Sequence, residues 1–131
     1  MRSLIVFFIL FSSLISASSN VSVEADFIVQ FNKIERPTDN QQRQLYNDLG
    51  KSVGLLEKKF SRPLLVAIIN VYSKLFVVNL AHFHLEPFVP YYLKNKAVVD
   101  EVLKATLPRA SQDEFYFRLQ LAIGEHLRGN G

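Results

Sequence analysis

Two segments of the chain alternate apolar and polar side chains, one from Glu24 to Glu35 and one from Glu114 to Gly124. Successive side chains of a β-strand point to opposite faces of a sheet, so a period of two residues predicts a strand in each segment. The run Arg36-Pro37-Thr38-Asp39 ends the first strand, because proline and aspartate favour turns.

Two other segments space their apolar residues by three or four positions. In the first, between Asn40 and Phe60, these residues are Leu45, Leu49, Val53, Leu56 and Phe60. A period near 3.6 predicts an amphipathic helix. A second helix is predicted from Tyr91 to Leu107, because Pro90 suits a first helical turn and Pro108 stops a helix.

The segment from residue 64 to residue 85 is apolar almost throughout, so one long helix and a pair of strands are alternatives. Its many β-branched residues favour strands, one from Leu64 to Tyr72 and one from Leu75 to Glu86. A short turn, Tyr72-Ser73-Lys74, would join them. Polar side chains such as Asn70 and Lys74 argue against a membrane span, where they would be costly.

The resulting order of elements is β-α-β-β-α-β. This order predicts an α+β, ferredoxin-like fold, in which two helices cover one face of a four-stranded antiparallel sheet. The side chains predicted to face the helices are Phe27, Val29, Phe31, Ala81, Phe83, Leu85, Phe115, Phe117, Leu119 and Leu121.

The first 19 residues have the layout of a secretory signal peptide: a basic start, a 12-residue apolar stretch from Leu4 to Ile15, and small residues after it. A retained membrane anchor is the alternative. Residues 20–131 then form a single domain with a core from about 23 to 124, and the protein is predicted to be secreted. Asn20-Val21-Ser22 is a sequon, which makes Asn20 a candidate for N-glycosylation.

The amino-acid composition excludes several kinds of functional site. The 131 residues include no cysteine, which excludes disulfides, a thiol nucleophile and thiolate metal sites. The net charge is only +3 and the basic residues form no continuous stripe, so the charge pattern does not indicate nucleic-acid binding. A secreted domain of this size without disulfides must be stabilised by its packing alone.

In its order of elements the chain resembles the SEA domain of extracellular and cell-surface proteins. Four pieces carry the resemblance: Phe27 to Phe31 as the first strand, Tyr46 to Phe60 as the first helix, Leu64 to Leu85 as the central hairpin, and Val99 to Leu107 as the second helix. The resemblance implies a non-enzymatic extracellular module that binds a protein or a glycan.

Many members of that family cut their own chain at a Gly-Ser pair in the hairpin turn. Here Lys74 and Leu75 stand in those two positions, and Ser73 is a displaced hydroxyl beside Tyr72, which lacks the conformational freedom of glycine. The resemblance therefore implies a member that does not cut itself.

His82, His84 and Glu86 alternate along the predicted third strand, so their side chains would share a face and could bind zinc. We prefer the interpretation that these side chains form a solvated polar face, and we predict no metal site. No phosphate-binding loop or nucleophile motif is present, and we predict neither a cofactor nor an enzymatic activity.

Two other functions stay open. One is a module like a protease propeptide, which shares the β-α-β-β-α-β order and would inhibit through the open sheet and the tail at residues 127–131. The other is an all-α lipid-binding protein, which requires residues 64–85 to form one helix. The predicted edge strand from Leu64 to Val71 has few charges, so homodimerisation through the sheet edge is a further prediction.

Overall fold

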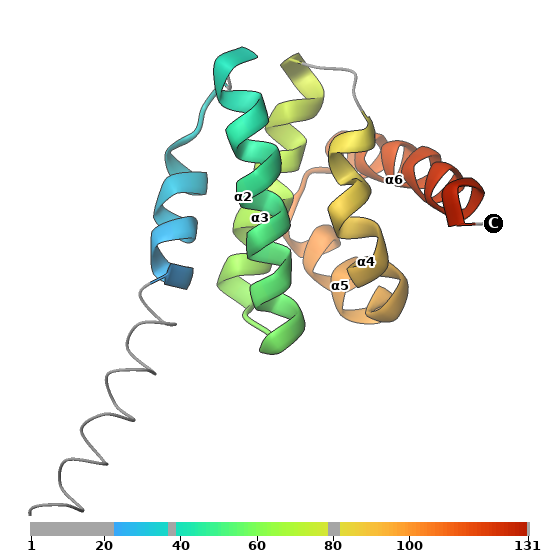
Figure 1. Ribbon diagram of the computed structural model, residues 1–131, viewed down its shortest axis with the longest axis horizontal. Coiled ribbons are helices and arrows are strands. Elements are labelled where there is room, and N and C mark those ends of the chain that lie inside the picture. Colours follow the sequence, from blue (N-terminus) through green and yellow to red (C-terminus); the bar gives the residue numbers. More distant parts are fainter. Residues whose placement is uncertain (1–22, 37–38, 79–81, 131) are drawn as a thin grey trace, which may run out of the picture.

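The computed structural model describes residues 23–36, 39–78 and 82–130, and within these ranges every element is a helix (Figure 1). In chain order they are a helix over residues 23–33, α2 (Asp39–Lys58), α3 (Arg62–Val78), the 3-10 helix η1 (His82–Phe88), α4 (Val89–Lys94), α5 (Lys96–Thr106) and α6 (Arg109–Asn130). None of these helices is long and apolar enough to cross a membrane.

The α+β, ferredoxin-like prediction is therefore wrong, and with it the resemblance to the SEA domain. The described residues contain no strand, hence no four-stranded sheet, no open sheet face and no sheet edge. Homodimerisation through a sheet edge and the propeptide-like inhibitor lose their structural basis for the same reason. The fold of the described residues is all-α.

The alternating segment near the C-terminus lies in α6, where two separate apolar stripes produce the alternation. Phe115, Leu119 and Ala122 are buried at spacings of four and three residues, as one face of a helix requires. Phe117 and Leu121 lie on the other side and are exposed. Together the two stripes make every odd-numbered position from 115 to 123 apolar, and this alternation imitates the pattern of a strand.

The segment near the N-terminus is also helical. Phe27 and Phe31 lie one turn apart and their rings stack with centroids 5.7 Å apart, with Phe31 fully buried. Val29, which would share their face in a strand, points away from the core and is exposed. The Lys74 ammonium donates a hydrogen bond to the carbonyl of Ile34 and so ties the end of this helix to α3.

The apolar segment for which the pattern predicts a hairpin instead starts with a single helix, α3, which continues to Val78. Its N-terminus is capped by Ser61, whose Oγ accepts a hydrogen bond from the Leu64 amide at 3.4 Å. Buried residues lie on several sides of it: Leu64, Leu65, Ala67, Ile68, Ile69, Val71, Tyr72, Leu75 and Phe76. Contacts on several sides stabilise the helix despite its β-branched residues, whose helix propensity is only slightly low. Ser73, Lys74 and Leu75 therefore lie within α3, where no hairpin turn exists.

Both predicted helices are present, with different limits. In α2 the residues Leu45, Leu49, Val53 and Leu56 are buried, as their spacing predicted, while Phe60 lies beyond the helix and is exposed. The second predicted helix is divided at Asn95 into α4 and α5. The Asn95 side chain caps α4 by donating a hydrogen bond to the Tyr91 carbonyl at 2.9 Å.

Candidate functional site

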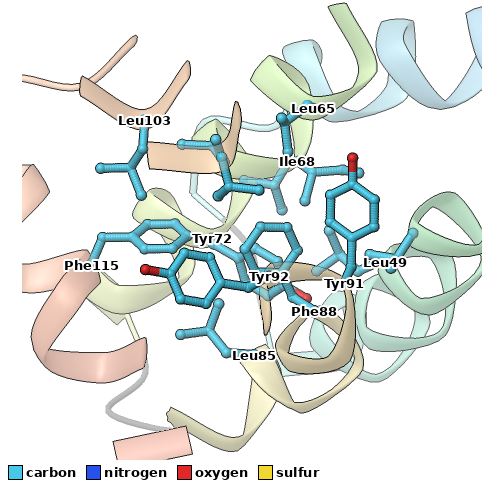
Figure 2. Packing of buried hydrophobic residues seen from close by; sticks show 14 of the residues in the cluster. Leu49, Leu65, Ile68, Tyr72, Leu85, Phe88, Tyr91, Tyr92, Leu103 and Phe115 are labelled. Atoms are coloured by element: carbon cyan, nitrogen blue, oxygen red, sulfur yellow. The ribbon is translucent and has the colours of Figure 1, made fainter. Parts of the chain in front are cut away.

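Aromatic side chains from α3, η1 and α6 meet in the core, and Figure 2 shows Tyr72, Phe88 and Phe115 among them. The Phe115 ring of α6 packs edge-on against Tyr72, Phe76 and Phe88, with centroids 5.5–6.2 Å apart. Tyr72 is fully buried, and its hydroxyl has no hydrogen-bond partner among the described residues. Burial raises the pKa of this phenol well above its ordinary value, so Tyr72 is neutral and carries an unsatisfied polar atom.

A surface pocket of about 280 Å³ lies between α3 and α6, next to this aromatic cluster. Its lining combines apolar and polar groups from both helices: Ser73, Phe76, Ala110, Ser111 and Glu114. The two helices supply residues spaced by three or four positions, which lie on one face of each helix.

The buried Arg118 holds the carboxylate of Glu114 in place beside the pocket. Its Nε and Nη2 both bind Oε1 of Glu114, at 2.8 and 2.7 Å, and its guanidinium lies over the Phe76 ring, 5.3 Å from the centroid. Both hydrogen bonds use the same carboxylate oxygen, so Oε2 of Glu114 is the acceptor that this side chain offers to a ligand. The pocket therefore has an aromatic wall, two hydroxyls and one carboxylate oxygen.

A smaller pocket, of about 160 Å³, lies between the helix over residues 23–33 and α2. Its lining is Gln30, Ile34, Gln41, Gln44 and Leu45. Beside it the buried Asp48 accepts hydrogen bonds from the side-chain amides of Gln30, at 2.7 Å, and Gln44, at 3.0 Å. These bonds join two helices, so we assign this cluster a structural role.

A second polar cluster joins α4, α5 and α6. Oδ1 of Asp100 accepts hydrogen bonds from the hydroxyls of Tyr92, at 3.1 Å, and Tyr116, at 2.8 Å. Burial, reinforced by the negative charge of Asp100, raises the pKa of Tyr92 to about 12. Burial and the hydrogen bond to Asp100 also raise the pKa of Tyr116.

Stability is expected to fall as the pH rises above 10. Between pH 10 and 12 the unfolded chain loses the Tyr92 proton at the ordinary pKa, while the folded chain keeps it because its pKa is about 12. Each tyrosine that is protonated in the folded chain and deprotonated in the unfolded chain lowers the unfolding free energy by about 1.4 kcal/mol for every pH unit. Urea unfolding at a series of alkaline pH values measures the slope. The variant Tyr92→Phe should show a shallower slope, and an unchanged slope would contradict the assignment.

The structure describes only part of the set of residues singled out from the sequence. Of the candidate metal ligands, Glu86 is exposed, and the side chains of His82 and His84 lie outside the described residues. Their backbone forms η1 and not the strand that would align them, and zinc binding by these three residues stays an untested alternative. Among the described side chains no group of three or more metal-ligating residues lies together. Asn20, the candidate for glycosylation, also falls outside the described residues.

Sequence reasoning identified Ser73 for another role and missed the rest of the pocket between α3 and α6. Phe76, Ser111 and Glu114 carry no motif, and they meet only because two helices cross. The spacing of Ser73 with Phe76, and of Ser111 with Glu114, would have placed each pair on one helical face, had the segments been predicted as helices.

Comparisons with protein-family models, with curated proteins and with solved structures find no match. The function is therefore inferred from the side chains themselves.

Proposed function

We propose that this chain is a secreted, non-enzymatic helical protein that binds a small amphipathic ligand in the pocket between α3 and α6. The ligand has an apolar tail and an amine or hydroxyl head. The mixed lining of the pocket, with Phe76 beside the carboxylate of Glu114, carries this proposal. It narrows the all-α lipid-binding alternative that the sequence left open.

The charge of the lining selects the head group. Glu114 attracts an ammonium group and accepts a hydrogen bond from a hydroxyl, and Ser73 and Ser111 can donate to or accept from either. A carboxylate head would lie beside the carboxylate of Glu114, and the Arg118 guanidinium that could attract it is already bound to that carboxylate, so this head should bind least tightly. The volume of about 280 Å³ is close to the lower end of the roughly 300–1,000 Å³ typical of small-molecule sites, which favours a short tail.

The sequence of the first 19 residues supports the secreted part of the proposal. These residues lie outside the described ranges, and their basic start, apolar stretch and small residues are those of an export signal. The absence of cysteine suits a protein that keeps its fold by packing, with a core of apolar side chains from every described helix.

Three probes that share one tail and differ in their heads test the ligand chemistry: octylamine, octanol and octanoate. At pH 7 we expect octylamine to bind most tightly, octanol next and octanoate least. Chemical-shift changes in two-dimensional NMR should concentrate at Ser73, Phe76, Ser111 and Glu114. Equal binding of all three probes, or shifts elsewhere, would overturn the proposal.

The variant Glu114→Gln removes the charge but keeps an oxygen that can accept the Arg118 hydrogen bonds. A hydrogen bond to a charged group contributes about 1.5–3 kcal/mol, so octylamine should bind at least about tenfold more weakly. Octanol binding should change little. Calorimetric titration measures both.

The matched control is Glu101→Gln on α5. Glu101 is exposed and pairs with Arg62 at 3.1 Å, away from the pocket lining. Octylamine affinity should be unchanged in this variant. A loss of equal size in both variants would mean that net charge, and not the pocket, controls binding.

A further inference from the structure

The outer side of α6 presents a second apolar face to solvent. Phe117 is 61% exposed and Leu121 is 42% exposed, and the two lie one helical turn apart. They point away from the buried stripe of Phe115, Leu119 and Ala122. In Figure 1 the C-terminal end of α6 is the outermost part of the bundle on its side. A face of this kind, on an otherwise complete core, indicates a binding surface.

The outer face of α6 is self-complementary. Along the helix it carries Asp113, Phe117, Gln120, Leu121, Gly124 and Arg128. A two-fold axis between positions 120 and 121 relates the first half of this set to the second: position 117 falls opposite 124, and position 113 falls opposite 128. An interface between two identical copies requires this kind of symmetry.

The side chains at positions 117 and 124, which lie opposite each other across the two-fold axis, are complementary in size. Phe117 is the largest side chain of the outer face and Gly124 has none. A Cβ added at Gly124 would meet no atom within 4 Å, so the surface beside this glycine is open. The ring of Phe117 from a second copy can fill that space, as a large residue packs against a small one between close helices.

The side chains at positions 113 and 128, which also lie opposite each other across the axis, have opposite charges. Asp113 is negative and exposed, and it pairs with Arg109, a highly exposed residue of the same helix, at 3.7 Å. Arg128 is positive and exposed in the last turn of α6. An antiparallel arrangement brings each aspartate near the arginine of the other copy, whereas a parallel arrangement places like charges together.

We propose that α6 binds a second copy of this chain, antiparallel, about a two-fold axis between Gln120 and Leu121. The interface consists of one pair of helices, which is smaller than the interfaces of about 1,200–2,000 Å² found in stable complexes. The dimer is therefore reversible and dissociates on dilution. It forms without a ligand, so its test is independent of the proposed function.

Charge reversal tests the orientation. Asp113→Arg and Arg128→Asp each place two pairs of like charges across the two-fold axis, so each variant should dimerise at least about fivefold more weakly. The double variant Asp113→Arg/Arg128→Asp restores opposite charges and should recover the affinity of the original chain. Sedimentation velocity over a range of concentrations measures the dissociation constant, and circular dichroism verifies the fold.

Phe117→Ser tests the apolar contact. It removes the ring from an exposed position, so the monomer should keep its stability while dimerisation is lost. A wild-type protein that stays monomeric at every concentration would overturn the proposal. So would a double charge variant that fails to recover dimerisation after both single variants have lost it.

Discussion

Replacing Phe115 by alanine is expected to lower the free energy of unfolding by about 3–5 kcal/mol. Phe115 is fully buried and its ring contacts the rings of Tyr72, Phe76 and Phe88. Truncation removes the apolar surface of the ring from the core and leaves a cavity that the surrounding helices fill only in part. Urea denaturation, with the midpoint and the slope both recorded, measures the loss.

Phe117→Ala is the matched control, because it makes the same chemical change two positions away on the same helix. Phe117 is exposed, so the expected change in unfolding free energy is within about 0.5 kcal/mol at concentrations where the protein is monomeric. In a strand the two residues would share one face and lose similar amounts. Equal losses would therefore contradict α6 and favour the predicted sheet.

Replacing Tyr72 by phenylalanine is expected to raise the free energy of unfolding by about 1–3 kcal/mol. The Tyr72 hydroxyl is buried and has no hydrogen-bond partner in the described part of the chain, while its ring contacts Phe76, Phe88 and Phe115. The substitution keeps those ring contacts and removes only the unsatisfied oxygen. Thermal and urea unfolding of the two proteins measure the gain.

Tyr116→Phe is the control for this prediction and should have the opposite sign. The Tyr116 hydroxyl donates a hydrogen bond to Asp100 at 2.8 Å, and a bond to a charged group contributes about 1.5–3 kcal/mol. Removing it should therefore destabilise the protein. A loss of stability in Tyr72→Phe as well would show that the buried Tyr72 hydroxyl has a partner, such as an ordered water.

The predicted helices that the structure confirms are those whose apolar residues lie on one side only. In α2 the spacing of Leu45, Leu49, Val53 and Leu56 left a polar opposite face, so period and burial agreed. The 11 residues of α5 follow the same rule, with Val99, Val102 and Leu103 buried. Asn95 interrupts the longer helix that was predicted there, because its side chain caps α4.

The pattern failed where a helix has apolar residues on more than one side. In α3 they lie on several sides because neighbouring elements surround it, so no period marks its face. In α6 the exposed Phe117 and Leu121 filled the positions between the buried ones and imitated a strand. Both errors have one cause: periodicity reports secondary structure only when a single face is apolar.

The sequence by itself determined the apolar residues available for a core, the amphipathic face of α2, the absence of cysteine chemistry, and an N-terminal pattern typical of export. Only the tertiary structure decided that residues 62–78 form one helix, that Phe115 and Phe117 face opposite ways, and that Ser73 meets Glu114 across a pocket. The physical reason is that local spacing fixes which residues of one element share a face. Which of two apolar faces is buried depends on partners distant in the chain.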